Sequence, residues 1–225
     1  MSKKIRVAIV GCGNCAKSLV EGVQYYIENP DDKVGLMYED IGGYTPSDLL
    51  FVCGFDVDIR KVNRPLKEAL RAKPNCAMDH VKEISDACIE KGAIVYSGPT
   101  LDGVAPYMLD FPEEVSFRTG AIPAESYERV VELLKYHKVD VLINYCPVGS
   151  EQASRFYIDA AIDARCHVIN CIPSIMRYPI WCVLSESISA RQISSVCSNE
   201  LNLIKKRPMR GAYFALTFSM YSPNT

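Results

Sequence analysis

Apolar and polar residues follow two different patterns along the first part of the chain. Residues 5–10 and 49–55 are almost continuously apolar. Such runs are typical of strands that are buried on both faces of a parallel sheet. Residues 14–28 instead repeat their apolar side chains near helical spacing, which predicts an amphipathic helix between the two strands.

The same alternation continues to residue 173. Further strands are expected at residues 93–96, 139–145 and 167–171. Further helices are expected at residues 62–71, 81–91, 125–137 and 151–164. Glycine- and proline-rich segments at 33–48 and 106–123 are expected to be a surface insertion and an irregular connection. Five strands that alternate with helices predict an α/β fold with a doubly wound, Rossmann-type parallel sheet.

The first strand runs directly into a glycine-rich turn. Gly11, Gly13 and Ala16 have the spacing G-x-G-x-x-A, and the amphipathic helix follows at once. Gly11 permits a sharp turn, Gly13 lets a pyrophosphate approach the backbone, and Ala16 lets the helix pack closely on the strand. The free N–H groups of the helix would then face the phosphates. We therefore expect a nicotinamide or flavin dinucleotide site, the alternative being a glycine turn in another kind of βα unit.

An acidic residue ends the second strand. In dinucleotide-binding units such a residue binds the ribose hydroxyls and disfavours a 2′-phosphate. Asp56 lies about 40 residues after Gly13, against about 20 in an ordinary unit, and the insertion at 33–48 accounts for the excess. Asp56 therefore favours NAD over NADP, although a solvated carboxylate at a strand end is the alternative.

Three later strands also end in loops with polar or flexible residues. The loop at 97–103 carries Asp102, the loop at 146–151 carries Ser150 as a candidate helix N-cap, and the loop at 170–173 follows the last strand. In a doubly wound sheet the loops at the carboxyl ends of the strands share one crevice, where ligands bind. We expect these loops to line that crevice, while ordinary connecting loops remain the alternative.

Other candidate chemistry is weaker. Cys12 and Cys15 form a C-x-x-C pair at a strand-to-helix turn, which is also the geometry of a redox motif. The glycine spacing already has its own explanation, and no second ligand pair is spaced for zinc. His80, His137 and His167 are far apart, so we expect no catalytic or metal-binding role for them.

Composition narrows the class of protein. The 225 residues carry 25 basic and 27 acidic side chains, a net charge of −2 that gives no sign of a nucleic-acid surface. The longest apolar run, residues 212–221, is about half of a membrane span, so no membrane partner is expected. Ten scattered cysteines and a start that leads straight into the first strand predict reduced thiols and a cytoplasmic location. We interpret the basic run at 205–207 as a solvated cluster rather than a targeting signal.

Several stretches together resemble a known family. They are VAIVGCGNCAKSLVEGVQYY, FDVD, GPTLDG, KVDVLINYCPVGSE and VINCIP, and they occur in this order within about residues 4–173. In combination they resemble the cofactor domain of the myo-inositol-phosphate synthases, in particular the shorter bacterial and archaeal type. The resemblance implies an NAD-dependent isomerase of the lyase-like kind that converts glucose 6-phosphate to inositol phosphate, in inositol and phospholipid biosynthesis.

The resemblance also implies a mechanism and a site. NAD would take a hydride from C5 of the sugar phosphate, the C6 enolate would close the ring on the C1 aldehyde, and the hydride would be returned. The family pattern assigns the cofactor site to Gly11, Gly13, Asn14, Cys15, Asp56, Asp102, Pro147, Val148, Gly149 and Ser150. The first four would lie along the pyrophosphate, Asp56 on the ribose, and the other five on the far side of the cofactor.

The last part of the chain departs from the family. The family stabilises its enolate with lysines of a second domain, one of them in a DIKSQ-like motif soon after the INCIP segment. This chain has no such motif, and LIKKRPM does not match it, so no catalytic residue is assigned. The family's second domain also builds a homotetramer and is longer than residues 174–225. We therefore expect residues 1–173 to be an NAD-binding domain and 174–225 a truncated or divergent remnant of the catalytic and oligomerisation domain.

The missing motif leaves three functions open. The first is an inositol-phosphate synthase. The second is another NAD-dependent dehydrogenase on the same nucleotide-binding domain, which the fold by itself cannot exclude. The third is a folded NAD-binding fragment without turnover, either a binding module or a non-functional remnant.

Overall fold

The computed structural model describes residues 4–104, 106–120, 122–173 and 193–195. Its strands are β1 (Ile5–Val10), β2 (Leu49–Asp56), β3 (Val95–Ser97), β4 (Val141–Asn144), β5 (His167–Asn170) and β6 (Ile193–Ser195). Its α-helices are α1 (Asn14–Glu28), α2 (Leu66–Ala69), α3 (Tyr127–Tyr136) and α4 (Glu151–Asp163). Two short 3-10 helices, η1 (Pro46–Asp48) and η2 (Pro106–Asp110), lie in the connections that were expected to be irregular.

All strand pairs of the sheet are parallel, and the strand order is β3-β2-β1-β4-β5-β6. The chain thus moves outward from β1 to β3, returns to the other side of β1, and moves outward again. The order reverses between β1 and β4, which is the position where open α/β sheets bind ligands. The predicted Rossmann-type sheet is confirmed, and the short strand β6 is an addition that the sequence analysis did not predict.

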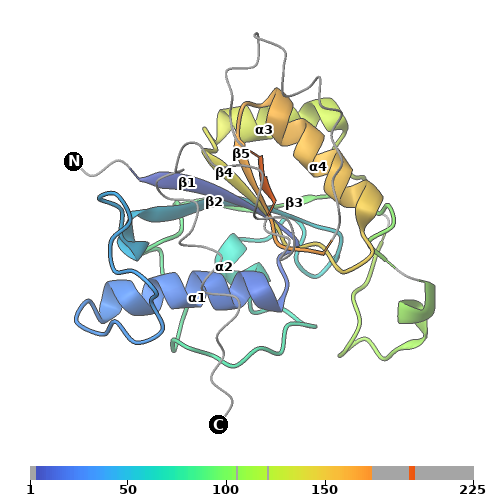
Figure 1. Cartoon of the computed structure of the whole chain (residues 1–225). Coiled ribbons are helices and arrows are strands. Elements are labelled where there is room, and N and C mark those ends of the chain that lie inside the picture. Colours follow the sequence, from blue (N-terminus) through green and yellow to red (C-terminus); the bar gives the residue numbers. More distant parts are fainter. Residues whose placement is uncertain (1–3, 105, 121, 174–192, 196–225) are drawn as a thin grey trace.

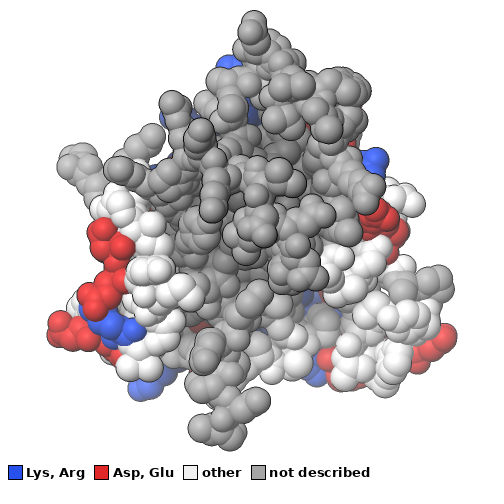
Figure 2. Space-filling view, viewed as in Figure 1, with Lys and Arg blue, Asp and Glu red and all other residues white. Residues whose placement is uncertain are grey.

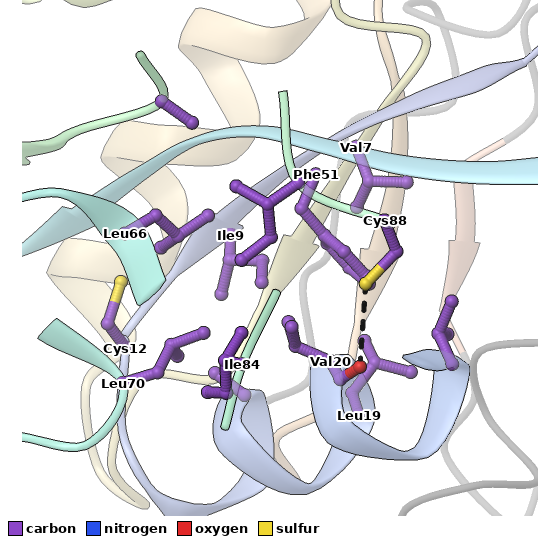
Figure 3. Close-up of a cluster of buried hydrophobic side chains, with 14 of the residues drawn as sticks. Val7, Ile9, Cys12, Leu19, Val20, Phe51, Leu66, Leu70, Ile84 and Cys88 are labelled. Carbon is purple, nitrogen blue, oxygen red and sulfur yellow. Dashed lines mark hydrogen bonds between the residues drawn. The ribbon is translucent and has the colours of Figure 1, made fainter. Parts of the chain in front are cut away.

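Helices cover both faces of the sheet (Figure 1). On one face, α1 and α2 pack on side chains such as Val7, Ile9 and Phe51, and this layer is drawn in Figure 3. On the other face, α3 and α4 cover a second cluster that includes Ala8, Val10 and Phe55. Adjacent residues of β1 therefore face opposite layers, which explains why the sequence of the strand shows no polar side.

Residues 81–91 contain no helix, so that prediction is wrong, and the helix expected at 62–71 shortens to Leu66–Ala69. The segment around residues 76–85 runs along α1, and α1 side chains bond to its backbone. Asn14 Oδ1 accepts from Cys76 N and Ala77 N, Lys17 Nζ donates to Ala77 O, Glu21 Oε2 accepts from His80 N, and Gln24 binds Ser85 N and Glu83 O. These side-chain partners satisfy the backbone without a helix.

The polar stripe of α1 is therefore an internal contact. Lys17, Glu21 and Gln24 are at most 4% exposed, although sequence periodicity assigns polar positions of a helix to solvent. Glu21 also pairs with Arg71 at 3.0 Å. Residues 81–91 help to fill the layer beneath the sheet through Val81, Ile84 and Cys88, whose thiol lies 3.6 Å from Val20 O (Figure 3).

Acidic and basic side chains are interspersed on the described surface visible in Figure 2. None of the described helices is both long enough and apolar enough to cross a bilayer. The basic run at 205–207 and the apolar run at 212–221 both fall outside the described residues. The division of the chain at residue 173 stays a prediction.

Candidate functional site

The glycine-rich turn lies at the point where the strand order reverses. Gly11 follows β1 with φ at +82°, and its N–H donates to Phe55 O of β2 at 2.8 Å. A Cβ on Gly11 would lie 2.7 Å from Tyr145 O, just beyond β4. Glycine is thus required at position 11 for two reasons. Its φ lies in the left-handed region, and its backbone packs so closely between the ends of two strands that a Cβ would not fit.

The N-terminus of α1 is open. Gly13 is the N-cap residue, and no side chain among the described residues bonds to the cap. A Cβ on Gly13 would have no described atom within 4 Å, so none of the described residues fills the space beside it. The first backbone N–H groups of a helix lack partners within the helix and carry the positive end of its dipole. This end of α1 is therefore suited to bind an anion.

Asp56 lies directly beside the turn. Its Oδ2 accepts from Cys12 N at 2.8 Å, and its Oδ1 accepts from Val57 N at 2.8 Å and Asp58 N at 2.9 Å. The structure thus brings Asp56 and the glycine-rich turn together, as the sequence analysis expected. Asp56 also orders the turn, a role that its position at the end of β2 did not reveal.

Lys61 lies beneath the turn, and the sequence analysis missed it. Its side chain is 4% exposed, its Nζ donates to Cys12 O at 2.9 Å and Asn75 Oδ1 at 2.8 Å, and it lies 3.9 Å from Asp56 Oδ2. Asn75 Nδ2 also donates to Cys12 O at 2.9 Å. Lys61 follows the FDVD stretch within five residues, but nothing in the pattern shows that its side chain is buried.

The C-x-x-C pair is divided between two environments. Cys12 is fully buried and Cys15 is exposed, and both are free thiols. Burial, together with the nearby Asp56 carboxylate, raises the pKa of the Cys12 thiol well above its usual value. Because the thiolate is the reactive form, this environment opposes a redox role for Cys12. Asn14 also differs from expectation, because its side-chain oxygen holds the backbone of residues 76–77.

Asp102 lies at the N-terminus of α4. Its Oδ2 accepts from Gln152 N at 2.7 Å, and its Oδ1 accepts from Ala153 N at 3.0 Å. Burial by itself would raise the pKa of Asp102, but these backbone N–H groups outweigh it and hold the pKa below its usual value. The carboxylate thus fills the helix end with an anion from the chain itself.

The loop at 147–150 adjoins the Asp102 loop. A Cβ on Gly103 would lie 3.2 Å from Ser150 Oγ, so the two loops touch. Gly149 has φ at +93°, and the Val148 side chain is 80% exposed. Ser150 is the N-cap residue of α4, but its Oγ is buried without a hydrogen-bond partner among the described residues.

Buried amides support the loops that follow β4 and β5. Asn144 Nδ2 donates to Ser154 Oγ and to Asn170 Oδ1, each at 2.9 Å, and Asn144 Oδ1 accepts from Cys146 N at 3.1 Å. Both asparagines end their strands and are at most 2% exposed. A hydrogen-bonded pair of this kind fixes the carboxyl ends of the two strands relative to each other.

The three histidines lie apart from this site. His80 is exposed, and His137 Nε2 is 2.8 Å from Tyr96 OH at the end of α3, where burial lowers the pKa of His137. His167 begins β5, at the amino ends of the parallel strands, whereas the glycine-rich turn lies at their carboxyl ends. Within the described ranges there is no group of three or more His, Cys, Asp or Glu side chains that could hold a metal ion.

The residues at the reversal point fit a dinucleotide. Within the described part of the chain, nothing caps α1, fills the space beside Gly13 or bonds to the Ser150 hydroxyl, and these features suit a pyrophosphate and a further polar group of the ligand. Gly11, Gly13, Cys12 and Asp56 form one connected unit. Asp102 and residues 147–150 form a second unit at the start of α4.

Relatives of known name match most of the chain. No family model matches it. The inositol-3-phosphate synthase of Mycobacterium tuberculosis strain H37Rv is 43% identical over 183 residues, which cover 80% of this chain and 46% of that protein. The enzyme of the same name from Corynebacterium glutamicum is 43% identical over 180 residues, with 79% and 46% covered. The chain thus spans about half the length of the curated relatives it matches.

Solved structures agree with the fold. The crystal structure of Ari2 is 30% identical with a TM-score of 0.61 and matches 76% of this chain and 46% of that one. A myo-inositol-1-phosphate synthase-related protein from Thermotoga maritima has a TM-score of 0.54 at 18% identity, with 76% and 49% covered, and this likeness concerns the fold.

Proposed function

We propose that residues 4–173 of this chain, which is homologous over about four fifths of its length to inositol-3-phosphate synthases, are the NAD-binding part of such an enzyme. The observation that carries the proposal is the open N-terminus of α1 beside Asp56 at the reversal of strand order. Dinucleotide pyrophosphates bind at this position in doubly wound folds.

Each predicted site residue has a place in the proposal. The backbone of Gly11, Gly13, Asn14 and Cys15 would lie along the pyrophosphate, and Asp56 would accept from the ribose hydroxyls. Asn14 would act through its backbone N–H, because its side-chain oxygen already bonds to residues 76–77. Asp102 would act by fixing α4, so that Pro147, Val148, Gly149 and Ser150 line the far side of the cofactor.

For the whole protein we propose conversion of glucose 6-phosphate to inositol phosphate. NAD, when bound, would supply a hydride acceptor for the sugar carbon and a donor for the return step. The described residues would hold the cofactor through every step, because the net reaction is redox-neutral. The lysines that stabilise the enolate in the family have no matching motif in this chain, which favours an NAD-binding protein without turnover as the second candidate.

The test has two parts on the purified chain. NAD is titrated while the melting temperature is measured, with NADP as the matched control, and a bound ligand raises the temperature according to its concentration over its Kd. We expect NAD to stabilise the chain and NADP to do so much less, because Asp56 disfavours a 2′-phosphate. Glucose 6-phosphate is then added with NAD, and inositol phosphate is measured.

The outcomes separate the candidates. Stabilisation by NAD with product supports the synthase function. Stabilisation without product supports the NAD-binding protein without turnover. If neither dinucleotide raises the melting temperature, the cofactor proposal is wrong.

A further inference from the structure

Lys61 is a buried charge that the dinucleotide site, as described so far, does not require. The residue is 3% exposed, and its ammonium group has two hydrogen-bond acceptors, Cys12 O and Asn75 Oδ1. Burial of an ammonium group costs several kcal/mol unless hydrogen bonds and an opposite charge compensate it. The compensation here comes from the turn itself and from Asp56, which lies 3.9 Å away.

Both the N–H and the carbonyl of Cys12 form hydrogen bonds with side chains of other segments. The N–H donates to Asp56 Oδ2 at 2.8 Å, and the carbonyl accepts from Lys61 Nζ and Asn75 Nδ2, each at 2.9 Å. Cys12 lies between the two glycines of the turn, which on their own allow many backbone conformations. The hydrogen bonds to both groups of Cys12 select one backbone conformation of the turn. In that conformation Gly13 is the N-cap of α1, and no described side chain caps the first N–H groups of the helix.

The charge of the ammonium group is balanced within the site. Among the described residues its ion-pair partner is Asp56, 3.9 Å away, so the pair leaves little net charge near the turn. The effect of Lys61 on a bound pyrophosphate is therefore expected to come from the position of the Cys12 backbone rather than from net charge.

We propose that Lys61 is a positioning residue that holds the glycine-rich turn in its pyrophosphate-binding conformation through the carbonyl of Cys12. This inference rests on the proposed NAD function. It adds a residue that lies 48 positions after Gly13 and does not belong to the glycine motif. Asn75 takes part as the second donor to the same carbonyl.

The test compares Lys61→Met with Lys67→Met. Lys67 is a half-exposed lysine that pairs with Asp86 on the outside of the fold, so its substitution removes the same charge away from the turn. Each variant is first shown to be folded, and NAD affinity is then measured by calorimetry well below the melting temperature. We expect about tenfold weaker NAD binding for Lys61→Met, which is about 1.4 kcal/mol, and no change for Lys67→Met.

A conservative variant and a second donor sharpen the result. Lys61→Arg keeps the charge and the donors, so it should recover most of the NAD affinity. Asn75→Leu removes the other donor to Cys12 O and should weaken NAD binding by a smaller factor. Lys61 and Asn75 donate to the same carbonyl. The change in NAD affinity caused by Lys61→Met should therefore differ between the unaltered chain and the Asn75→Leu variant.

The outcomes are distinct. If Lys61→Met folds and binds NAD within twofold of the unaltered chain, the positioning role is wrong. If Lys61→Met does not fold, Asn75→Leu decides, and unchanged NAD affinity in that variant contradicts the proposal. If the unaltered chain does not bind NAD, the proposed function itself fails, and the role of Lys61 fails with it.

Discussion

Two helices start at the same edge of the sheet and differ in what meets their first turns. Helix α1 follows β1 and has Gly13 as its N-cap residue, where no described side chain forms a cap. Helix α4 follows β4, and both carboxylate oxygens of Asp102 accept from its backbone N–H groups. The two helices have similar dipoles, so the difference lies in whether the chain supplies its own anion.

Under the proposed function, this difference would direct the phosphates of the cofactor to α1 rather than to α4. At α4 the anion is part of the structure, and it ties the loop at 97–103 to the helix. At α1 the carboxylate of Asp56 is close, but it bonds to Cys12 in the turn before the helix. Among the described residues, no carboxylate accepts from the first N–H groups of α1.

The largest expected effect comes from filling the open end. Gly13→Asp would place a carboxylate at the N-cap of α1, where φ is −87° and there is room for a Cβ. We expect the free energy of unfolding to rise by a few tenths of a kcal/mol, because aspartate is a somewhat better N-cap than glycine. NAD binding should weaken at least about 100-fold, because the new carboxylate takes the donors and repels phosphate.

Both quantities are measured on the same sample, by chemical denaturation and by calorimetry. Gly13→Ser is the matched control, since it adds an N-cap without a charge and should weaken NAD binding less. Unchanged NAD affinity in Gly13→Asp would show that the phosphates do not bind at α1.

The opposite change removes the Asp102 carboxylate from the N-terminus of α4. Asp102→Ala removes two hydrogen bonds from the first turn of α4, and we expect a loss of about 2 kcal/mol of stability, at the upper end for a helix cap. Chemical denaturation measures it. The control is Asp31→Ala, an exposed carboxylate, which should change stability by less than about 0.5 kcal/mol. Equal stabilities of the two variants would contradict the capping role of Asp102.

Helix α3 offers an intermediate case, because its cap is local and uncharged. Ser126 Oγ accepts from Arg129 N at 3.2 Å. Ser126→Ala should cost about 1 kcal/mol, which is less than Asp102→Ala, since a neutral acceptor interacts less strongly with the helix dipole than a carboxylate. Thermal unfolding of the two variants side by side tests the order. A larger loss for Ser126→Ala would reverse it.

The smallest expected effect is the loss of stability at low pH when Asp102, at the N-terminus of α4, becomes protonated. The pKa of Asp102 is lowered in the folded chain, so its contribution to stability is present above its unfolded pKa of about 3.9. That contribution is lost as the pH falls through the folded pKa. Between pH 5 and pH 3, the unaltered chain should therefore lose more stability than Asp102→Ala. Parallel curves for the two proteins would show that Asp102 is not ionised against the helix end.

Much of this site is local in sequence and could be predicted. The turn from Gly11 to Ala16 follows a strand and opens a helix, and the structure shows this arrangement with the helix bounds expected. Asp56 was expected near the turn because parallel strands bring their carboxyl ends to one edge. These predictions depended on a few residues and on one general property of the fold.

Other features depend on distant contacts and could not be predicted in this way. Residues 81–91 have an apolar spacing that fits a helix, yet their neighbours run along α1 and are bonded by its polar side chains. A pattern of polar residues on a helix does not say whether it faces water or another segment. Lys61 was missed for the same reason, since only its contacts with Cys12 and Asn75 show that its side chain is buried against the glycine-rich turn.

By itself, the sequence determined the alternation of strands and helices, the glycine-rich turn and the family resemblance, because each is a property of neighbouring residues. The tertiary structure decided which helix end stays open. Asp102 lies 49 positions before Glu151 at the start of α4, and Asp56 lies 44 positions after Cys12, so both contacts join separate segments. Whether a carboxylate caps a helix, orders a turn or awaits a ligand depends on the N–H groups that the fold brings within reach.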